Sequence, residues 1–278
     1  MTRWGHAHLR PGSGHVSPRP QVVAHRGSSE VNPEHTLGAY LAALDEGADA
    51  LECDVRLTAD GHLVCVHDRR VDRTANGRGL VSTMDLEQLD ELDFASWKNP
   101  WADLDDEAVE VDVERRKVLT LRRLLEAVAD YDRPVELAIE TKHPTRYAGL
   151  VERRLVEVLA SYRWTGRDGP ARVMSFSYVA LGRVKKLAPH VDVVQLVDRL
   201  YSWQVTKNLV GDDWIAGPGI DLLRENPRFR ERLAGSGRRI HVWTVNTAED
   251  LDLCVELGVE AVITDTPGRA VAHLEGRR

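Results

Sequence analysis

The chain has 278 residues, of which 42% are hydrophobic, and this content suits an ordinary globular protein with a sizeable core. Its 37 basic and 44 acidic residues give a formal charge of −7, and twelve of the acidic residues fall between Asp85 and Glu114, where Lys98 is the one basic residue. The remainder, with 36 basic and 32 acidic residues, shows no basic stripe that would bind nucleic acid, and an anionic membrane surface is not an expected partner.

The N-terminal residues 1–20 are rich in Gly, Pro, His and Arg, and we expect them to form a disordered tail. This tail lacks the apolar stretch of a secretory signal, and no run approaches the roughly 20 apolar residues of a membrane span. Cys53, Cys65 and Cys254 fit no metal-ligand spacing and are typical of buried thiols in a reducing compartment. We therefore expect a cytoplasmic protein without stable membrane association.

From residue 21 to residue 278 we expect one domain in which short strands alternate with helices, as in an α/β fold with a mainly parallel sheet. The predicted strands are Val22–His25, Ala50–Val55, Leu63–His67, Val135–Glu140, Val173–Phe176, Asp192–Leu196, Trp214–Ala216, Ile240–Val245 and Ala261–Thr264. The predicted helices are Thr36–Glu46, Leu121–Ala129, Arg146–Ser161, Val179–Leu187, Pro227–Ala234 and Ala248–Leu257. Thr120 is placed to cap the second of these helices.

One of the nine predicted strands does not fit a parallel barrel. Residues 56–62 are the whole connection between the second and third strands, and a parallel crossover needs a dozen residues or more. We therefore expect an antiparallel hairpin with its turn at Asp60-Gly61. The other eight strands then make a TIM (β/α)8 barrel, a fold that usually takes roughly 250 residues.

The segment 68–117 interrupts the alternation of strands and helices. It is acidic and too long for an ordinary connection between two elements. A helix at Thr83–Asp93 fits its middle, because Leu86 and Leu89 lie on one helix face. We interpret the segment as a small insertion over the barrel mouth, not as an independent domain.

Two carboxylates mark a candidate site on the second strand. Glu52 and Asp54 are two residues apart, so their side chains point to the same face of the strand. In a barrel that face can be the lumen, near the carboxyl end where active sites lie. Neighbouring carboxylates repel each other unless a cation neutralises them, which favours a divalent metal. A lone Glu-x-Asp is nevertheless far more often a surface feature, so other residues must support it.

The predicted hairpin supplies that support, because it brings His67 back to the level of Asp54. Four further groups stand at the carboxyl ends of predicted strands: His25, Arg26, Glu140 and Lys142. A histidine at the end of an apolar strand is by itself usually a core residue. Together these groups offer metal ligands, two proton carriers and two cations, a set that suits displacement at phosphorus.

Seven segments form an ordered series: HRGSSEVNPEHT at 25–36, ECDVRLTADGHLVCVHD at 52–68, DRTANGRG at 72–79, ELAIETK at 136–142, SF at 175–176, WTVN at 243–246 and GVEAVITDTP at 258–267. In sequence and spacing this series resembles the glycerophosphodiester phosphodiesterase family, over residues 22 to about 267. Any one segment can arise by chance, but seven in order are specific. The family also carries an insertion where 68–117 lies here, which separates it from the related sphingomyelinase D and phosphatidylinositol phospholipase C enzymes.

The resemblance implies metal-dependent hydrolysis of glycerophosphodiesters to glycerol 3-phosphate and an alcohol, with one bound Ca²⁺ or Mg²⁺. The implied metal ligands are Glu52, Asp54 and Glu140. The implied acid–base pair is His25 and His67, and the implied phosphate ligands are Arg26 and Lys142. In the mechanism usually proposed for the family, the glycerol 2-hydroxyl attacks phosphorus and a cyclic phosphate is then hydrolysed. The resemblance leaves open which histidine is the acid and which the base.

Two aromatic residues are predicted substrate contacts. Phe176 and Trp243 end predicted strands at the barrel mouth, where each could cover a glycerol backbone. Ordinary core packing explains each of them about equally well.

The segment NPEHT at 32–36 departs from the family, which usually has Asn-Pro-Glu-Asn-Thr. We expect His35 at an exposed helix start, where Thr36 or His35 itself caps the helix in place of the asparagine. A structural role is the expectation for His35. Glu34 is expected to orient Arg26, with a metal contact as the alternative.

Small diesters such as glycerophosphocholine or glycerophosphoethanolamine are the expected substrates. A lysophospholipase D acting on lysolipids is an alternative, which would need an apolar groove or an amphipathic surface element at the mouth. A barrel that binds phosphodiesters without cleaving them is a second alternative, and the complete set of predicted ligands and histidines argues against it. The residues distinguish neither the leaving alcohol, nor the preferred ion, nor the oligomeric state.

Overall fold

The structure is a computed structural model, and it describes residues 19–98, 116–143 and 145–277. The strands in these ranges are β1 Gln21–His25, β2 Ala50–Leu57, β3 Leu63–Cys65, β4 Glu136–Thr141, β5 Ala171–Ser175, β6 Asp192–Val197, β7 Ile215–Pro218, β8 His241–Val242 and β9 Ala261–Thr264. The α-helices are α1 Leu37–Asp45, α2 Leu86–Asp90, α4 Leu121–Ala129, α5 Leu150–Ser161, α6 Tyr178–Leu187, α7 Leu200–Thr206, α8 Ile220–Glu225, α9 Pro227–Ala234, α10 Ala248–Glu256 and α11 Pro267–Gly276. Short 3₁₀ turns lie at Val81–Thr83 and Ser96–Lys98.

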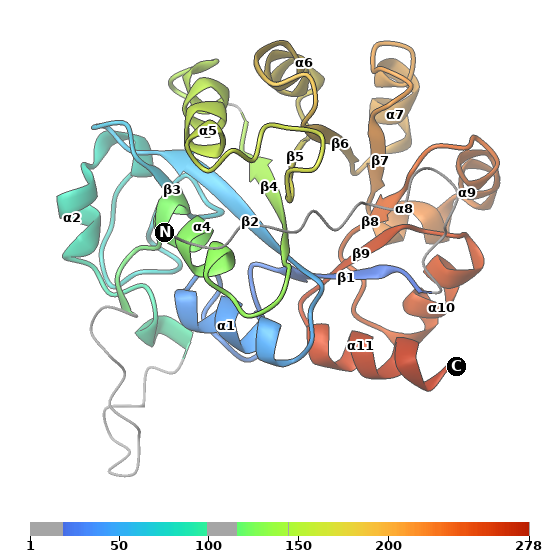
Figure 1. Ribbon diagram of the computed structural model, residues 1–278, viewed down its shortest axis with the longest axis horizontal. Coiled ribbons are helices and arrows are strands. Elements are labelled where there is room, and N and C mark those ends of the chain that lie inside the picture. The colour runs from blue at the N-terminus through green and yellow to red at the C-terminus, as the bar shows by residue number, and fades with distance from the viewer. Residues whose placement is uncertain (1–18, 99–115, 144, 278) are drawn as a thin grey trace.

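The parallel strands form a barrel with the helices outside it (Figure 1). The hydrogen-bonded order is β7-β6-β5-β4-β2-β1-β9-β8. Two parallel bridges, Ala216 with Ile240 and Gly219 with Trp243, join the two ends of this series. The eight-stranded TIM barrel predicted from the sequence is confirmed.

The hairpin after β2 is confirmed as well, because β3 pairs with β2 in the antiparallel sense. Gly61 in its turn has φ +88°, a left-handed conformation that costs glycine little. The paired strand ends at Cys65, two residues earlier than predicted. The ladder continues in one bond, in which Val66 N donates to Asp54 O at 3.0 Å. His67 therefore follows directly at the level of Asp54.

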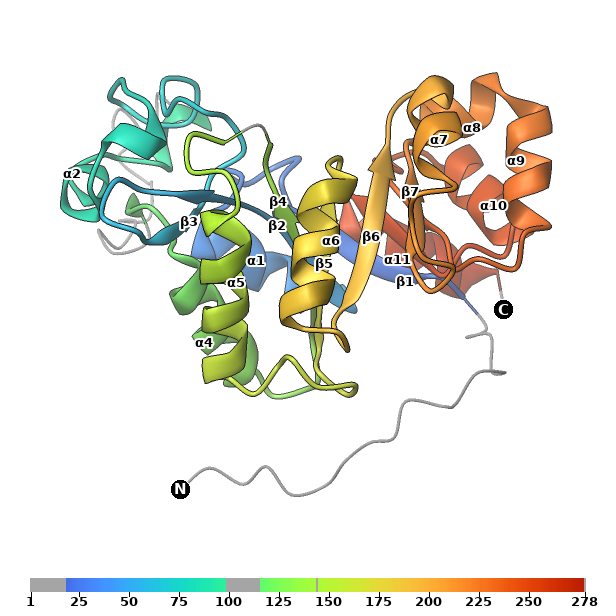
Figure 2. The same ribbon diagram turned by 90° about the horizontal axis from the view of Figure 1, so that it is seen from above.

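The described part of the insertion packs beside the hairpin, and Figure 2 shows α2 next to β3. Its apolar side chains form one cluster with the hairpin and the segment before α4: Val64, Val66, Val71, Ala75, Val81, Leu89, Phe94 and Val118. Asp85 and Gln88 form a capping box at the start of α2, which is shorter than the predicted 83–93 helix. Residues 1–18 and 99–115 lie outside the described residues. The disordered tail at 1–20 and the limits of the insertion at 68–117 therefore stay predictions.

Inward-facing side chains fill the barrel below its mouth: Val23, Ala50, Ala138, Met174, Val194, Leu196, Ile215, Ala261 and Ile263. Successive residues of a strand alternate between the lumen and the surrounding helices. Val23 precedes His25 by two residues and Ala50 precedes Glu52 by two, so the candidate site residues continue these inward rows toward the carboxyl ends of the strands. The apolar layer thus forms the floor of the site.

Several elements differ from the predictions. The sequence patterns predict none of α7, α8 and α11, although α11 has Pro267 in its first turn. α7 and α8 are short and have no side-chain cap, so they carry little local signal. β8 is limited to His241–Val242 because the backbone after it turns toward β7, where Trp243 N donates to Pro218 O at 3.3 Å. The cap by Thr120 on α4 is confirmed, since its side chain accepts from Arg123 N.

Candidate active site

Three carboxylates meet where β2 and β4 approach the barrel mouth. The parallel register places Asp54 beside Glu140, and Glu52 lies two residues earlier on the same face of β2. One oxygen of each side chain lies within 4.8 Å of the others. All three residues are buried. The structure thus brings together the residues predicted to bind a metal.

Two cations lie against these carboxylates. Lys142 Nζ is 2.9 Å from both Asp54 Oδ1 and Glu140 Oε1. Arg26 Nε is 3.1 Å from Asp54 Oδ2, and the Arg26 backbone N donates to Glu52 Oε2 at 3.1 Å. The residues predicted to hold phosphate therefore border the acidic cluster directly.

The three carboxylates differ in the direction in which the site shifts their pKa values. Burial acts to raise the pKa of Asp54, but Lys142 and the other nearby donors outweigh it and hold this pKa well below its usual value. Burial and then the charge of Asp54 raise the pKa of Glu52 well above its usual value. The same two causes, in the same order, raise the pKa of Glu140 to about 8. With the protein's own cations alone, the site favours the ionised form of Asp54 and opposes ionisation of Glu52 and Glu140.

A hard divalent cation fits this donor set. Carboxylate oxygens are the ligands that Ca²⁺ and Mg²⁺ prefer. Asp54 Oδ1 is buried, and among the described residues its partner is the Lys142 ammonium, without a further hydrogen bond. A bound divalent ion would also offset the repulsion that opposes ionisation of Glu52 and Glu140. The acidic triad can therefore hold a metal ion, and oxygen ligands of this kind leave its identity open.

His25 ends β1 and is held by a carboxylate. Its Nδ1 lies 2.6 Å from Asp265 Oδ1. Asp265 also accepts hydrogen bonds from Asn246 Nδ2 at 2.6 Å and from Ser29 Oγ at 3.0 Å. Burial acts to raise the pKa of Asp265, but these donors, His25 first, lower it. An ionised carboxylate only accepts, so Nδ1 carries a proton and Nε2 remains for the cavity.

His67 is likewise held by a carboxylate. Its Nδ1 lies 2.7 Å from Asp68 Oδ1, and Arg73 Nε donates to Asp68 Oδ2 at 2.6 Å. Burial, followed by the charges of Lys142 and Arg26, lowers the pKa of His67 to about 4, although Asp54 opposes this shift. The imidazole of His67 is therefore neutral at physiological pH, with the Nε2 lone pair available.

A cavity of about 150 Å³ lies among these groups. The residues that line it are His25, Arg26, Glu52, His67, Glu140, Lys142, Met174, Phe176, Leu196, Trp243, Thr244 and Ile263. The rings of Phe176 and Trp243 meet edge to face, with centroids 5.4 Å apart. Trp243 Nε1 donates to Gly217 O at 2.8 Å, which fixes its ring in the wall. Both aromatic residues predicted as substrate contacts thus border the cavity.

Glu34 connects Arg26 to the insertion. Its Oε1 lies 3.1 Å from Arg26 Nη1, the contact expected of a residue that orients Arg26. Arg73 of the insertion donates to both Glu34 oxygens at 2.7 Å. Burial acts to raise the pKa of Glu34, but Arg73 and Arg26 lower it to about 2. Glu34 is therefore an anion between two guanidinium groups.

The expectation of an exposed His35 is wrong. His35 is buried, and its Nε2 lies 2.9 Å from Asp54 Oδ2. The cap of α1 belongs to Thr36 alone, whose side chain accepts from Ala39 N. His35 has φ +61°, and this left-handed turn directs its side chain inward instead of along the helix start. His35 is thus a site residue that the sequence reasoning placed at the surface.

The predicted site residues do not include Asp265, Asp68 and Arg73. Asp265 directly follows β9, so the rule that places active sites at carboxyl strand ends could have found it. Asp68 is the neighbour of His67 in sequence, and a backing carboxylate is a common partner of a working histidine. Arg73 lies in the insertion, and no periodicity or strand end points to it.

Comparisons with known proteins show which family this chain resembles. The model of the "Glycerophosphoryl diester phosphodiesterase family" matches residues 25–269. A "Probable glycerophosphodiester phosphodiesterase 1" of Mycobacterium tuberculosis (strain H37Rv) is 45% identical over 267 residues, covering 93% of this chain and 94% of that protein. A "Glycerophosphodiester phosphodiesterase" of Bacillus subtilis is 32% identical and covers 88% of this chain and 83% of that protein.

Solved structures share the barrel. A phosphodiesterase of Oleispira antarctica, determined in complex with the product sn-glycerol-3-phosphate, has a TM-score of 0.77 at 26% identity and covers 92% of this chain and 97% of that one. A glycerophosphodiester phosphodiesterase of Thermotoga maritima has a TM-score of 0.67 at 22% identity, covering 91% and 98%, and shows the same fold. Among the described residues, no helix combines the length and apolar character needed to cross a bilayer.

Proposed function

The chain belongs to the glycerophosphoryl diester phosphodiesterase family, and on that basis we propose which of its residues carry out the reaction. It is a phosphoric diester hydrolase that cleaves glycerophosphodiesters to glycerol 3-phosphate and an alcohol. The observation that carries the assignment of residues is the pair of carboxylate-backed histidines that share one small cavity with Glu52 and Glu140, two members of the acidic cluster.

Glu52, Asp54 and Glu140 are the proposed ligands of one divalent cation, Ca²⁺ or Mg²⁺. When bound, the ion supplies positive charge to the phosphoryl oxygens. Lys142 and Arg26 are the proposed phosphate ligands, since both border the cavity and both form an ion pair with Asp54 of the acidic cluster. Fixed cations of this kind stabilise the charge that develops on phosphoryl oxygens in the transition state.

His67 is the proposed base and His25 the proposed acid. Burial and the surrounding cations keep His67 neutral at physiological pH, and Asp68 holds its Nδ1 proton, so Nε2 is able to accept a proton. His25 is paired through Nδ1 with the Asp265 carboxylate, which leaves its Nε2 for the cavity, and we assign to Nε2 the proton that the leaving alcohol receives. The family resemblance alone left these two roles unassigned.

The proposed reaction has two steps. The glycerol 2-hydroxyl passes its proton to His67 as its oxygen bonds to phosphorus, while the bond from phosphorus to the alcohol oxygen breaks and His25 protonates the leaving alcohol. Water then opens the cyclic phosphate with the two histidines in exchanged roles, and glycerol 3-phosphate is released. Phe176 and Trp243 are the proposed walls for the glycerol carbons.

A substitution at His67 tests this division between metal ligands and proton carriers. His67→Ala should abolish release of glycerol 3-phosphate from glycerophosphocholine and leave calorimetric binding of the divalent ion intact. His190→Ala is the matched control, because His190 is exposed and outside the cavity. Loss of metal binding together with turnover in His67→Ala would show that the assignment of ligands is wrong.

A lysophospholipase D activity is the second candidate, and one observation favours it. Phe176 and Val179 are exposed, at 43% and 45%, beside the mouth. Both line a shallow surface depression that shares Phe176 with the catalytic cavity. Val179→Asp should lower kcat/KM for lysophosphatidylcholine and spare glycerophosphocholine if an acyl chain lies there. Equal effects on both substrates would remove this candidate.

The proposed partner is the small-molecule substrate, without nucleic acid or stable membrane association. A cytoplasmic location is proposed from the cysteines. Cys53, Cys65 and Cys254 are buried free thiols, as expected in a reducing compartment.

A further inference from the structure

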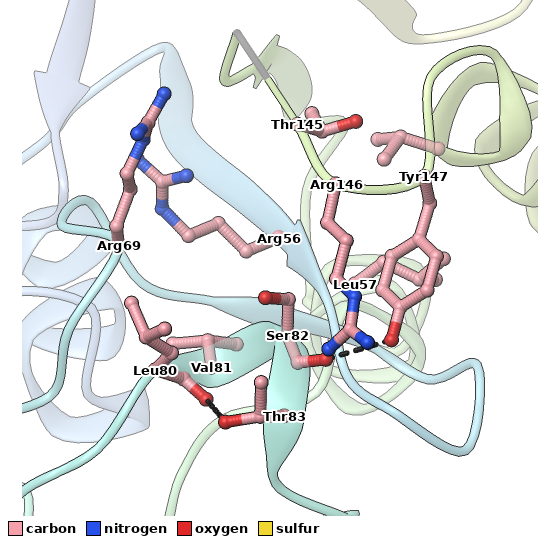
Figure 3. Close-up of a pocket in the computed structure, with 11 residues that line it drawn as sticks. Arg56, Leu57, Arg69, Leu80, Val81, Ser82, Thr83, Thr145, Arg146 and Tyr147 are labelled. Atoms are coloured by element: carbon pink, nitrogen blue, oxygen red, sulfur yellow. Dashed lines mark hydrogen bonds between the residues drawn. The ribbon is translucent and has the colours of Figure 1, made fainter.

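A second, larger cavity lies close to the backbone of His67. Its volume is about 490 Å³, and it shares no lining residue with the catalytic cavity. Its walls come from the end of β2, from Arg69 after the hairpin, from residues 80–83 with the first 3₁₀ turn of the insertion, and from the segment at 145–151 that leads into α5. Figure 3 shows these parts of the chain around the cavity. The volume falls in the range of roughly 300–1,000 Å³ that is typical of small-molecule sites.

Three arginines supply the charge of this cavity: Arg56, Arg69 and Arg146. No Asp or Glu is among the described residues that line it. In Figure 3 the guanidinium groups of Arg56 and Arg69 lie side by side, while Arg146 extends toward Ser82. A concave surface with several cations and no lining carboxylate is complementary to an anion.

Arg56 is held in place by the protein and still has donors to offer. Its Nε and Nη2 donate to the His67 carbonyl oxygen at 2.9 and 2.6 Å. The guanidinium has five N–H groups in a planar fork, and within the part of the chain that the structure describes no hydrogen bond engages its Nη1. An anion placed between the adjacent guanidinium groups of Arg56 and Arg69 would offset the repulsion between these two like charges.

The floor of the cavity is apolar and firm. Leu57, Val81 and Val151 are all buried residues that line it. Tyr147 donates from its hydroxyl to Ser82 O at 2.7 Å, which joins the α5 side to the insertion (Figure 3). A ligand here therefore meets guanidinium groups at one end and carbon surface below.

We propose that this cavity is a second binding site, for a small molecule that carries a phosphate monoester, with the phosphate held by Arg56 and Arg69 and its other end near Arg146. A monoester dianion balances two adjacent guanidinium groups, and the planar arginine fork matches phosphate oxygens in pairs. None of the proposed catalytic residues lines this site, so binding here is measured separately from turnover.

The test is a titration of the metal-loaded protein with inorganic phosphate and with glycerol 2-phosphate, followed by backbone amide NMR. The amides of Ser82, Thr83 and Tyr147 report on this cavity, and the amide of Phe176 reports on the catalytic one. We expect saturable shifts at the first three amides, with an affinity at least tenfold weaker in Arg69→Gln and in Arg146→Gln. Arg122→Gln, an exposed arginine on α4 outside the cavity, should bind like the wild type.

The proposal is overturned if these amides do not shift, or if they shift with unchanged affinity in both arginine variants while thermal unfolding shows that the variants are folded. Enzyme kinetics then distinguish whether the bound phosphate belongs to the substrate or to a separate molecule. If Arg146→Gln raises KM only for diesters whose alcohol carries its own phosphate, the cavity binds the alcohol end of the substrate. An unchanged KM for such diesters, with weaker binding of glycerol 2-phosphate, identifies a separate phosphorylated molecule.

Discussion

His35 Nε2 lies 2.9 Å from Asp54 Oδ2, in the interior of the site. The other ring nitrogen, Nδ1, lies 2.8 Å from the hydroxyl of Tyr40, which donates to the Glu52 carbonyl at 3.1 Å. One buried imidazole thus connects the start of α1 to both β2 residues proposed as metal ligands. Where the family usually has an asparagine, this chain has a positioning residue for Asp54.

The first prediction concerns this contact. His35→Ala removes a hydrogen bond to a proposed ligand, and loss of such a partner typically weakens metal binding about 10- to 100-fold. His35→Asn should lose less, because asparagine tolerates the φ of +61° found here and its amide can donate to a carboxylate. Calorimetric titration of both variants with Ca²⁺ measures the difference. Equal, wild-type affinities in both variants would mean that His35 only packs.

The second prediction is a pH dependence of metal binding. In the metal-free protein burial and Asp54 raise the pKa of Glu140 to about 8, so Glu140 is mostly protonated near pH 7, and the same two causes raise the pKa of Glu52 well above its usual value. Carboxylate ligands must lose their protons to bind metal. Affinity should therefore rise from pH 6 to pH 9, with protons released on binding at pH 7. Titrations in two buffers of different ionisation enthalpy count these protons, and a count of zero would disagree with the cluster described.

The third prediction separates the two histidines. His25→Ala removes the proposed acid, so the loss in kcat should be large for glycerophosphocholine and much smaller for a glycerophosphodiester with a nitrophenol leaving group. General acid–base groups typically contribute about 10²- to 10⁴-fold. His67→Ala should be severely impaired with both substrates, because the base is needed whatever group leaves. The reverse pattern would exchange the two roles.

The fourth prediction concerns Arg73. Its guanidinium holds Glu34 and Asp68, which in turn contact Arg26 and His67. Arg73→Gln should lower kcat about tenfold or more through misplacement of these groups, a change of about 1.4 kcal/mol in barrier height.

Arg70→Gln is the control for Arg73→Gln, because Arg70 pairs with exposed Asp72 away from the cavity. An Arg73→Gln enzyme with the kcat of Arg70→Gln would show that the insertion is not needed to position the site.

The barrel and most of the site follow from local patterns. Strand ends identified His25 and Glu140, and the short connection to β3 predicted that His67 lies beside Asp54, because a hairpin fixes register over a few residues. These inferences need only alternation along strands and the common rim of a parallel barrel. The resemblance to a family then supplied the expected roles.

The remaining contacts depend on tertiary structure. His35 turns inward through a positive φ, which the sequence pattern of a helix start does not reveal. Arg73 reaches Glu34 across 39 positions of sequence. The arginine-lined cavity likewise needs Arg56, Arg69 and Arg146 to meet from three separate segments. Such contacts between distant segments leave no periodic signal in a single sequence.

Removal of the metal tests the central claim most directly. The purified protein is treated with a chelator, and release of glycerol 3-phosphate from glycerophosphocholine is measured before and after Ca²⁺, Mg²⁺ or Mn²⁺ is restored separately. We expect the chelated protein to lose nearly all turnover, to regain it with about one ion bound per chain, and Asp54→Asn to regain none. Undiminished turnover by the chelated protein would contradict a metal site at Glu52, Asp54 and Glu140.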